Sequence, residues 1–236
     1  MFCSTGFFFE AHDLLPPATP LFGFQRVPYI SRIADYGHSA ELKGRKKQLV
    51  MAVENIPQAE AFRRSMAAAL DTPIRLAGSF YEVSLSNSNP LLHPSRLYTL
   101  FNNWHEGVFF PHNPQFYAEW TVEASELYIA MDKEFQALLG MLPVAKGSIP
   151  SVLEYYESKD AESLTDKISH IPAFQGILSP MLQTGGGFVP DFTSRYFTED
   201  FPFGMRFIVE TAHSHHCPIP TIERTFEWGM GKIAHS

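Results

Sequence analysis

Two stretches of the chain hold residue types that could move a proton and bind a carboxylate. The first is Asn89-Pro90-Leu91-Leu92-His93-Pro94, in which the imidazole of His93 can change charge near neutral pH. Its two prolines stiffen the backbone, and Asn89 followed by Pro90 predicts a helix start with His93 in the first turn. The plainer interpretation is that a single histidine near a helix start is only a hydrogen-bonded polar residue.

The second stretch combines an arginine, two acids and aromatic residues beside a proline and a glycine. It reads Thr193-Ser194-Arg195-Tyr196-Phe197-Thr198-Glu199-Asp200-Phe201-Pro202-Phe203-Gly204. An arginine can hold a carboxylate with two parallel hydrogen bonds, and an aspartate can orient a histidine and stabilise its protonated form. An alternative with equal support is a helix N-terminus, where Thr198, Glu199 and Asp200 complement the helix dipole.

Three glycine-containing features could indicate nucleotide binding, and none of them satisfies the motif that it resembles. The stretch from Gly229 to Ala234 has the spacing G-x-G-x-x-A, but a whole helix must follow that motif and the chain ends two residues later. Residues 185–187 are three glycines without the Lys-Ser/Thr pair of a P-loop. Gly140 is a predicted helix C-cap. The residues therefore show no dinucleotide-binding fingerprint.

A group of histidines near the C-terminus could form a metal cluster. It consists of His213, His215, His216 and Cys217. On a helix only His213 with His216 or Cys217 would share a face, and no second group of ligands stands out elsewhere. We therefore expect no metal site.

The composition indicates a globular protein of one or two domains. The chain has 236 residues, of which 45% are hydrophobic, and a net charge of −7, which argues against a nucleic-acid-binding face. No apolar run is long enough to span a bilayer, and we interpret the run of phenylalanines at 7–9 as core. Cys3 and Cys217 are too few for a disulfide framework, which favours a reducing compartment such as the cytoplasm.

The elements that must position the candidate residues divide the chain near residue 87. Short strands and turns are predicted over residues 1–56, including a β-hairpin of 39–42 and 48–53 around Gly44. A helix is expected from Pro57 to about residue 70, a short strand at 74–76 and an extended piece at 80–85. This mixture suggests the closing part of an α/β sheet.

From about residue 88 onward, helical patterns dominate. Helices are predicted over 94–104, 115–139, 152–158, 164–169 and 196–212, and the three glycines at 185–187 are expected to form a flexible loop. The apolar stripe of 115–139 is the strongest of these patterns, and we interpret it as core rather than as a cofactor site.

The two stretches together resemble the helical C-terminal domain of the opine dehydrogenases, the octopine and nopaline type. Residues 24–33 and the pair Tyr36-Gly37 are also similar to the last part of that family's nucleotide-binding domain. The resemblance implies a mainly α fold. Residues 88–236 would form the helical substrate domain, a bundle like that of 6-phosphogluconate dehydrogenase. Residues 1–87 would be the C-terminal remnant of a Rossmann-type α/β domain.

The family carries out the NAD(P)H-dependent reductive condensation of an α-keto acid with the amino group of an amino acid. The resemblance implies that His93 is the acid/base, that Asp200 orients it, that Arg195 anchors a substrate carboxylate and that Asn89 lines the same site. We therefore predict that His93 and Asp200 lie within hydrogen-bond reach, or one water apart, in a cleft between the two domains.

Family members begin with a glycine-rich βαβ unit that this sequence lacks, so we expect either a fragment of a longer enzyme or a truncated gene product. Binding of NAD or NADP is then expected to be weak or absent. Exposed apolar faces of the strands at 21–24 and 49–53 would favour homodimers or larger assemblies. The alternative is a catalytically inactive helical domain that binds amino-acid-like ligands or mediates dimerisation.

Overall fold

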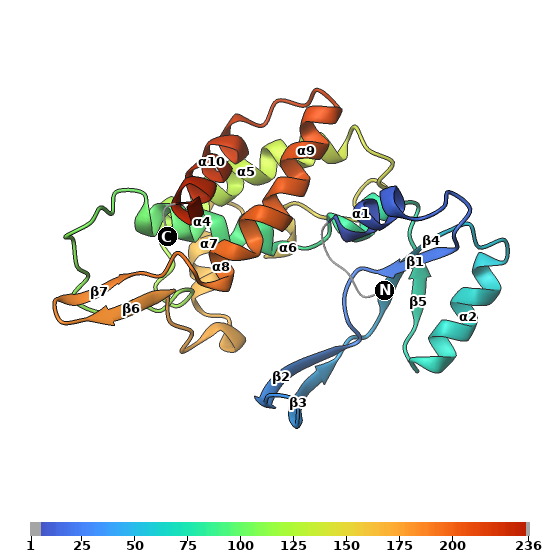
Figure 1. Cartoon of the computed structure of the whole chain (residues 1–236), viewed down its shortest axis with the longest axis horizontal. Coiled ribbons are helices and arrows are strands. Elements are labelled where there is room, and N and C mark those ends of the chain that lie inside the picture. The colour runs from blue at the N-terminus through green and yellow to red at the C-terminus, as the bar shows by residue number, and fades with distance from the viewer. Residues whose placement is uncertain (1–5, 235–236) are drawn as a thin grey trace. The chain divides into compact units, whose positions relative to one another are not determined.

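The computed structural model describes residues 6–234, the side chain of Arg32 excepted, and divides into two compact units (Figure 1). The first unit contains the described residues up to Asn87 together with Leu142–Ile149. The second contains Ser88–Met141 and the chain from Pro150 onward. Cys3 lies outside the described residues. Within the described part of the chain, no helix has the length and apolar character needed to cross a membrane.

The first unit is built on a three-stranded sheet in the order β1-β4-β5. Strand β4 (Leu49–Glu54) runs antiparallel to β1 (Leu21–Phe24) and parallel to β5 (Ile74–Leu76), to which it is joined through helix α2 (Ala59–Ala69). Helices α1 (Phe7–Leu14) and α3 (Phe80–Ser84) contribute a second apolar cluster. The unit is therefore α/β in character.

The two faces of β4 are both covered, because alternate residues of a strand point to opposite sides of the sheet. Leu49 and Met51 pack in one cluster with side chains of α2, and Ala52 packs in the other with Phe8 and Phe80. Leu49 and Met51 are fully buried. The prediction that the strands at 21–24 and 49–53 expose their apolar faces is therefore wrong.

Exposed apolar residues of this unit lie on a separate hairpin of β2 (Tyr29–Asp35) and β3 (Ser39–Arg45), and Leu14 at the end of α1 is 85% exposed as well. Ile33 and Leu42 on this hairpin are 67% and 65% exposed. The predicted hairpin around Gly44 is wrong, because Gly44 lies within β3 opposite Ile30 and the turn is at residues 36–38. There Gly37 adopts φ +76°, which glycine reaches without steric cost.

Residues 80–85, predicted as extended, form helix α3 instead. The cause is local, because the side chain of Ser79 accepts a hydrogen bond from the backbone N–H of Glu82 and so caps the helix. The predicted helix at 57–70 and strand at 74–76 are present as α2 and β5.

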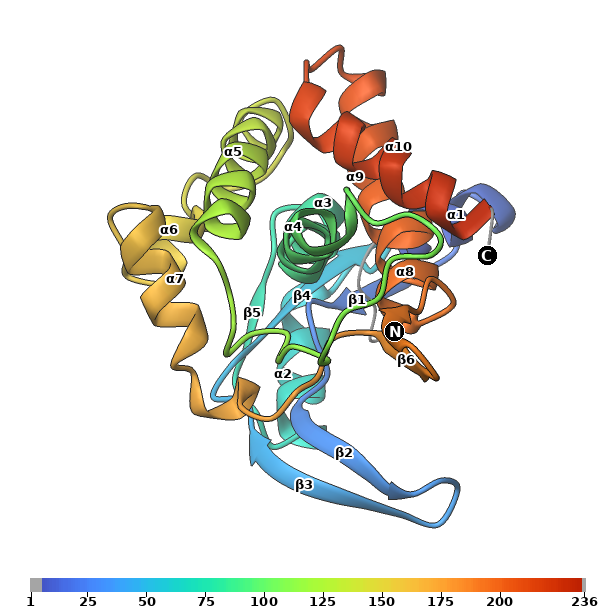
Figure 2. The same ribbon diagram turned by 90° about the vertical axis from the view of Figure 1, so that its left-hand side faces the viewer.

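Helix α4 (Asn89–Phe101) is the centre of the second unit. It contacts α5 (Val122–Leu139), α10 (Pro220–Ala234) and the π-helix η2 (Asp200–Met205). Figure 2 looks almost along the axis of α4, with α5 and α10 on either side of it. The remaining elements are α6 (Val152–Tyr155), α7 (Ala161–Ser169), η1 (Pro172–Phe174), β6 (Met181–Thr184), β7 (Gly187–Pro190), α8 (Arg195–Thr198) and α9 (Arg206–Ser214).

All five helices predicted in this unit have bounds that differ from those expected. Helix α4 begins at Asn89 rather than at residue 94, α6 ends at Tyr155, and α7 begins at Ala161. The helix predicted over 115–139 begins only at Val122, because Thr121 caps it and residues 116–119 form turns. The continuous helix predicted over 196–212 is divided into α8, η2 and α9. The three glycines at 185–187 lie at the turn of the β6–β7 hairpin.

Candidate active site

His93 lies in the second turn of α4 and is 8% exposed. The helix begins at Asn89 with Ser88 as its N-cap residue, so the predicted cap at Asn89 is one position too late along the chain. The backbone carbonyl of Ser88 accepts the hydrogen bond from the N–H of Leu92, which fixes this start. Pro90 occupies an early position where a missing N–H is tolerated.

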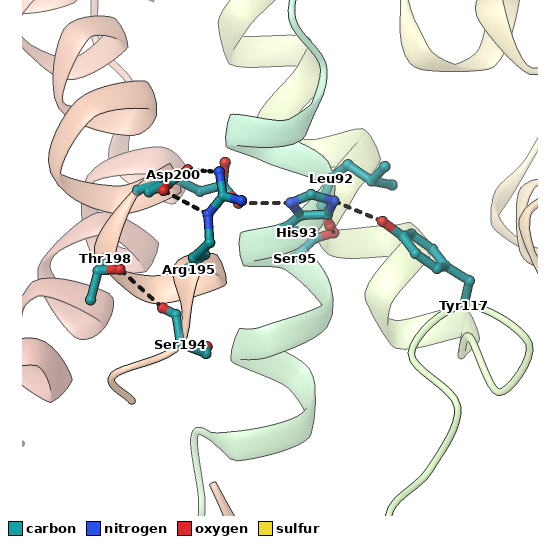
Figure 3. Close-up of polar contacts among 9 residues, drawn as sticks. Leu92, His93, Ser95, Tyr117, Ser194, Arg195, Thr198 and Asp200 are labelled. Atoms are coloured by element: carbon teal, nitrogen blue, oxygen red, sulfur yellow. Dashed lines mark hydrogen bonds and ion pairs between the residues drawn. The ribbon is translucent and has the colours of Figure 1, made fainter. Parts of the chain in front are cut away.

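Asp200, at the start of η2, meets His93 from a position 107 residues further along the chain (Figure 3). Asp200 Oδ2 lies 2.7 Å from His93 Nδ1, and the two side chains are 17% and 11% exposed. The predicted hydrogen-bond reach is confirmed, while the placement in a cleft between domains stays a prediction. A carboxylate only accepts, so Nδ1 carries a hydrogen and Nε2 of the neutral ring is an acceptor.

Tyr117 forms a hydrogen bond with that second ring nitrogen, and its hydroxyl lies 2.7 Å from His93 Nε2. Burial, chiefly, raises the pKa of Tyr117, and the neighbouring hydroxyl of Tyr196 adds to the effect. The phenol therefore keeps its proton and can donate to neutral His93. Helical periodicity does not single out Tyr117, because it assigns this residue to the predicted helix 115–139, whereas Tyr117 lies in the non-helical segment before α5.

Aromatic rings surround the His93–Asp200 pair. The ring of Tyr196 on α8 lies edge-on to the imidazole at 4.8 Å, and that of Phe116 lies at 5.8 Å. Tyr117 itself stacks on Phe174 at 4.1 Å. The surroundings of the pair are therefore low in water, which strengthens charge interactions within it.

Arg195, the predicted carboxylate anchor, lies on α8 one turn before Glu199. Its Nε and Nη2 donate to the two carboxylate oxygens of Glu199 at 2.7 and 2.8 Å, and the pair is exposed (Figure 3). These hydrogen bonds raise the pKa of Arg195 and lower that of Glu199. Arg195 thus already makes the two-pronged contact that it would offer a substrate. Asn89 is exposed one helical turn before His93, so both lie on one side of α4.

The π-helix η2 sets the position of Asp200. Pro202 within it has no N–H to donate, and the N–H of Arg206 bonds to the carbonyl of Phe201, five residues back, in the wider π-helical pattern. Gly204 brings η2 against α4, because a Cβ there would lie 2.6 Å from Pro90 Cγ. Gly229 of α10 likewise allows the ring of Phe201 to approach. Asp200 is therefore held by close packing on both sides.

The glycines and histidines that could have bound a nucleotide or a metal do not form such a site in the described residues. Gly229 and Gly231 lie inside α10 and not in a strand–turn–helix. The connections from β4 to α2 and from β5 to α3 do not contain the three spaced glycines that grip a pyrophosphate, so the described residues do not fit that part of a dinucleotide. His213 pairs with Glu223, and within residues 6–234 no group of three His, Cys, Asp or Glu side chains could hold a metal ion.

Comparisons with known proteins agree on one family. The model of a protein family described as "NAD/NADP octopine/nopaline dehydrogenase, alpha-helical domain" matches residues 76–232. Octopine dehydrogenase from Mizuhopecten yessoensis is 27% identical over 247 residues, and tauropine dehydrogenase from Arabella iricolor is 28% identical over 254. These matches cover 97% and 96% of this chain, but the chain spans only 61% and 62% of these relatives.

Solved structures show the same relation. An octopine dehydrogenase in complex with NADH and agmatine is similar with a TM-score of 0.80 at 25% identity, covering 99% of this chain and 62% of that one. A D-mandelate dehydrogenase, 10% identical with a TM-score of 0.57, shows a related fold alone. These likenesses confirm the predicted fold class, a mainly α protein whose helical domain follows a partial Rossmann-type α/β unit.

Proposed function

The chain belongs to the octopine/nopaline dehydrogenase family, and on that premise we propose that it serves the reductive condensation of an α-keto acid with the amino group of an amino acid. The observation that carries this proposal is the His93–Asp200 hydrogen bond in an aromatic, poorly hydrated surrounding. NAD or NADP would supply the hydride. The described residues do not contain a binding motif for its pyrophosphate, and the roles of these residues are proton transfer and carboxylate binding.

Condensation requires a proton at a defined point. The amine adds to the keto carbonyl, and the resulting carbinolamine loses water only when its hydroxyl is protonated. Protonated His93 is the source of that proton, and the carboxylate of Asp200 stabilises the charged ring and fixes its orientation. In the reverse direction, neutral His93 accepts the proton.

Substrate binding is the role that we propose for Arg195 and Asn89. Arg195 would hold the carboxylate of the keto acid with its planar fork and would release Glu199 as it does so. Asn89, one turn before His93, would line the same site. Glu199 thus acts as a stand-in for the substrate carboxylate when no substrate is bound.

The same Arg195–Glu199 pair favours a second candidate function. If Glu199 keeps the guanidinium permanently, this domain would be catalytically inactive and would serve ligand binding or dimerisation. In either case we propose a homodimer in the cytoplasm. The exposed apolar residues of the β2–β3 hairpin support self-association, and the low cysteine content supports the compartment.

The test measures NADH- and NADPH-dependent condensation of pyruvate with a panel of amino acids. It uses the chain itself and a fusion that adds the glycine-rich βαβ unit of a relative, with nucleotide binding followed by calorimetry. His93→Ala should lower turnover by roughly 100- to 10,000-fold, the usual contribution of a positioned acid/base. Asp200→Asn should give a milder loss.

The matched control is His170→Ala, which removes an exposed histidine that also pairs with an aspartate, Asp166. It should leave turnover unchanged. Near-normal turnover of both site variants, corrected for the folded fraction, would contradict the enzymatic proposal and favour the inactive domain.

A further inference from the structure

A hollow of about 370 Å³ opens in the second unit beside the C-terminal half of α4. Its lining comes from α4, from the segment between α4 and α5, and from the first turn of α5, and it includes none of the candidate active-site residues described above. One part of the lining, here called the apolar wall, consists of Leu100, Phe110, Pro111 and Pro114. A hollow of this volume is large enough for a small molecule.

Arg96 supplies a buried positive charge to this hollow, because it belongs to the lining and is only 3% exposed. Its Nε donates to the carbonyl of Phe116 at 3.2 Å and its Nη2 donates to that of Glu119 at 2.7 Å. These bonds use two of the five guanidinium N–H groups, and no carboxylate among the described residues forms an ion pair with Arg96.

The burial of this unpaired cation is unfavourable, and it lowers the pKa of Arg96 to about 10. The guanidinium still carries its charge at neutral pH. A buried charge is costly unless an opposite charge or further hydrogen bonds compensate it. The free N–H groups of Arg96 therefore favour an anionic group of a ligand, and their planar arrangement suits a carboxylate.

Two exposed carboxylates, those of Glu119 and Glu123, line the same hollow. Their negative charges act on Arg96 and partly offset the effect of burial on its pKa, although neither carboxylate is hydrogen-bonded to it within the described residues. Glu119 Oε1 accepts a hydrogen bond from the N–H of Gln115 at 2.7 Å, and its Oε2 lies 3.6 Å from Nε2 of the exposed His112. The hollow thus combines a buried cation with two exposed anions.

Contacts that need no ligand hold the lining in place. The backbone of Phe110 exchanges two hydrogen bonds with that of Phe188 on β7, at 2.8 and 2.9 Å. The two bonds of Arg96 fix the turn that leads to Glu119. The side chain of Thr121 accepts a hydrogen bond from the N–H of Ala124 and so fixes the start of α5. Preformed lining of this kind is typical of small-molecule sites.

We propose that this hollow is a binding site for a free amino acid with an apolar side chain, separate from the candidate active site. The α-carboxylate would bind Arg96, the α-ammonium group would lie between Glu119 and Glu123, and the side chain would pack on the apolar wall. A ligand with only a negative charge is repelled by the two glutamates, and a ligand with only a positive charge is repelled by Arg96. A zwitterion satisfies both.

The experiment measures binding of L-leucine by calorimetry, without nucleotide. It uses the whole chain carrying Arg195→Ala, which removes the carboxylate anchor of the proposed active site. Two further probes each lack one charge of L-leucine: 4-methylpentanoate lacks the ammonium group and 3-methylbutylamine lacks the carboxylate. Each should bind at least roughly 10-fold more weakly than L-leucine, because hydrogen bonds to charged groups contribute about that much.

Glu123→Gln removes one exposed charge from the hollow, so the variant should fold. It should weaken binding of L-leucine by roughly 10-fold and should not weaken binding of 4-methylpentanoate. The matched control is Glu126→Gln, an exposed position of the same helix that does not line the hollow, which should change neither. Arg96→Lys should weaken binding of both probes, because an ammonium group cannot reproduce the planar contact.

The site is overturned if L-leucine does not bind, if the three probes bind equally well, or if Glu123→Gln behaves like Glu126→Gln. These results decide the question even if Arg96→Lys does not fold. The measurement is independent of the function proposed above. If L-leucine binds as described but the fusion has no activity, the site stands and the proposed function fails. If the fusion is active but the Arg195→Ala chain does not bind L-leucine, the function stands and the site fails.

Discussion

Replacing Gly229 by alanine tests whether close packing of α10 against η2 holds the site together. A Cβ at this position would lie under 3.0 Å from three carbons of the Phe201 ring, and that ring is fully buried. Phe201 directly follows Asp200, so any movement of the ring is passed to the carboxylate that bonds His93. Gly231 provides the matched control, because it lies in the same helix and a Cβ there meets nothing within 4 Å.

The two substitutions should have opposite signs. Overpacking of a tight core typically destabilises by about 1–3 kcal/mol. Alanine in a helix interior gains about 1 kcal/mol over glycine. Gly229→Ala should therefore lose up to about 2 kcal/mol, and Gly231→Ala should gain up to about 1 kcal/mol. For a chain of this size 1 kcal/mol corresponds to about 2–4 °C in Tm.

Thermal unfolding followed by circular dichroism measures both effects, and turnover per folded molecule in the fusion measures the displacement of Asp200. Gly229→Ala should lower both Tm and turnover, whereas Gly231→Ala should raise Tm slightly and leave turnover unchanged. Equal Tm values for the two variants would refute the reasoning, because helix propensity alone treats the two positions alike.

Three further predictions concern contacts elsewhere in the second unit. Gly204→Ala should lower turnover and Tm together, since its Cβ would press on the rigid ring of Pro90; steady-state kinetics and thermal melts measure these effects. Arg195→Lys should raise KM for the keto acid and Glu199→Gln should lower it; a change in Tm alone would indicate that the pair only caps a helix. Burial raises the pKa of Asp132 in the folded state. Between the ordinary aspartate pKa and the raised one, Asp132 is protonated in the folded state but not in the unfolded state, so the free energy of unfolding falls as the pH rises through this range. Asp132→Asn should remove that part of the pH dependence, as urea unfolding of both proteins across this range would show.

The sequence could predict the His93–Asp200 contact because both residues belong to stretches with unusual local composition. Proline on both sides of His93, and Pro202 with Gly204 after Asp200, restrict the backbone in ways that a sequence shows directly. Only the resemblance to a family indicates that the stretch around His93 and the stretch around Asp200 meet, because no local pattern relates two segments so far apart in the sequence.

Other features depend on partners that local patterns do not contain. Tyr117 acquires its role from His93, which lies 24 residues earlier in the sequence. The sequence pattern pairs residues 39–42 with 48–53 because Gly44 is typical of a turn, whereas Gly37 makes the turn and β3 pairs with β2. Arg195 is expected from the resemblance to anchor a substrate carboxylate, yet its guanidinium is bound by Glu199, one helical turn away in the same stretch.

The π-helix makes the number of residues between α8 and α9 important for the site, in addition to their identity. Each residue of an α-helix advances the chain by about 100° around the axis. Deleting one residue from Asp200–Met205 would therefore swing α8 by about that angle relative to α9. Tyr196 would turn away from His93, although every residue type of the site would still be encoded. A homologous chain that keeps His93, Tyr196 and Asp200 but has one residue fewer in that segment would therefore encode the residues of the site without bringing them together.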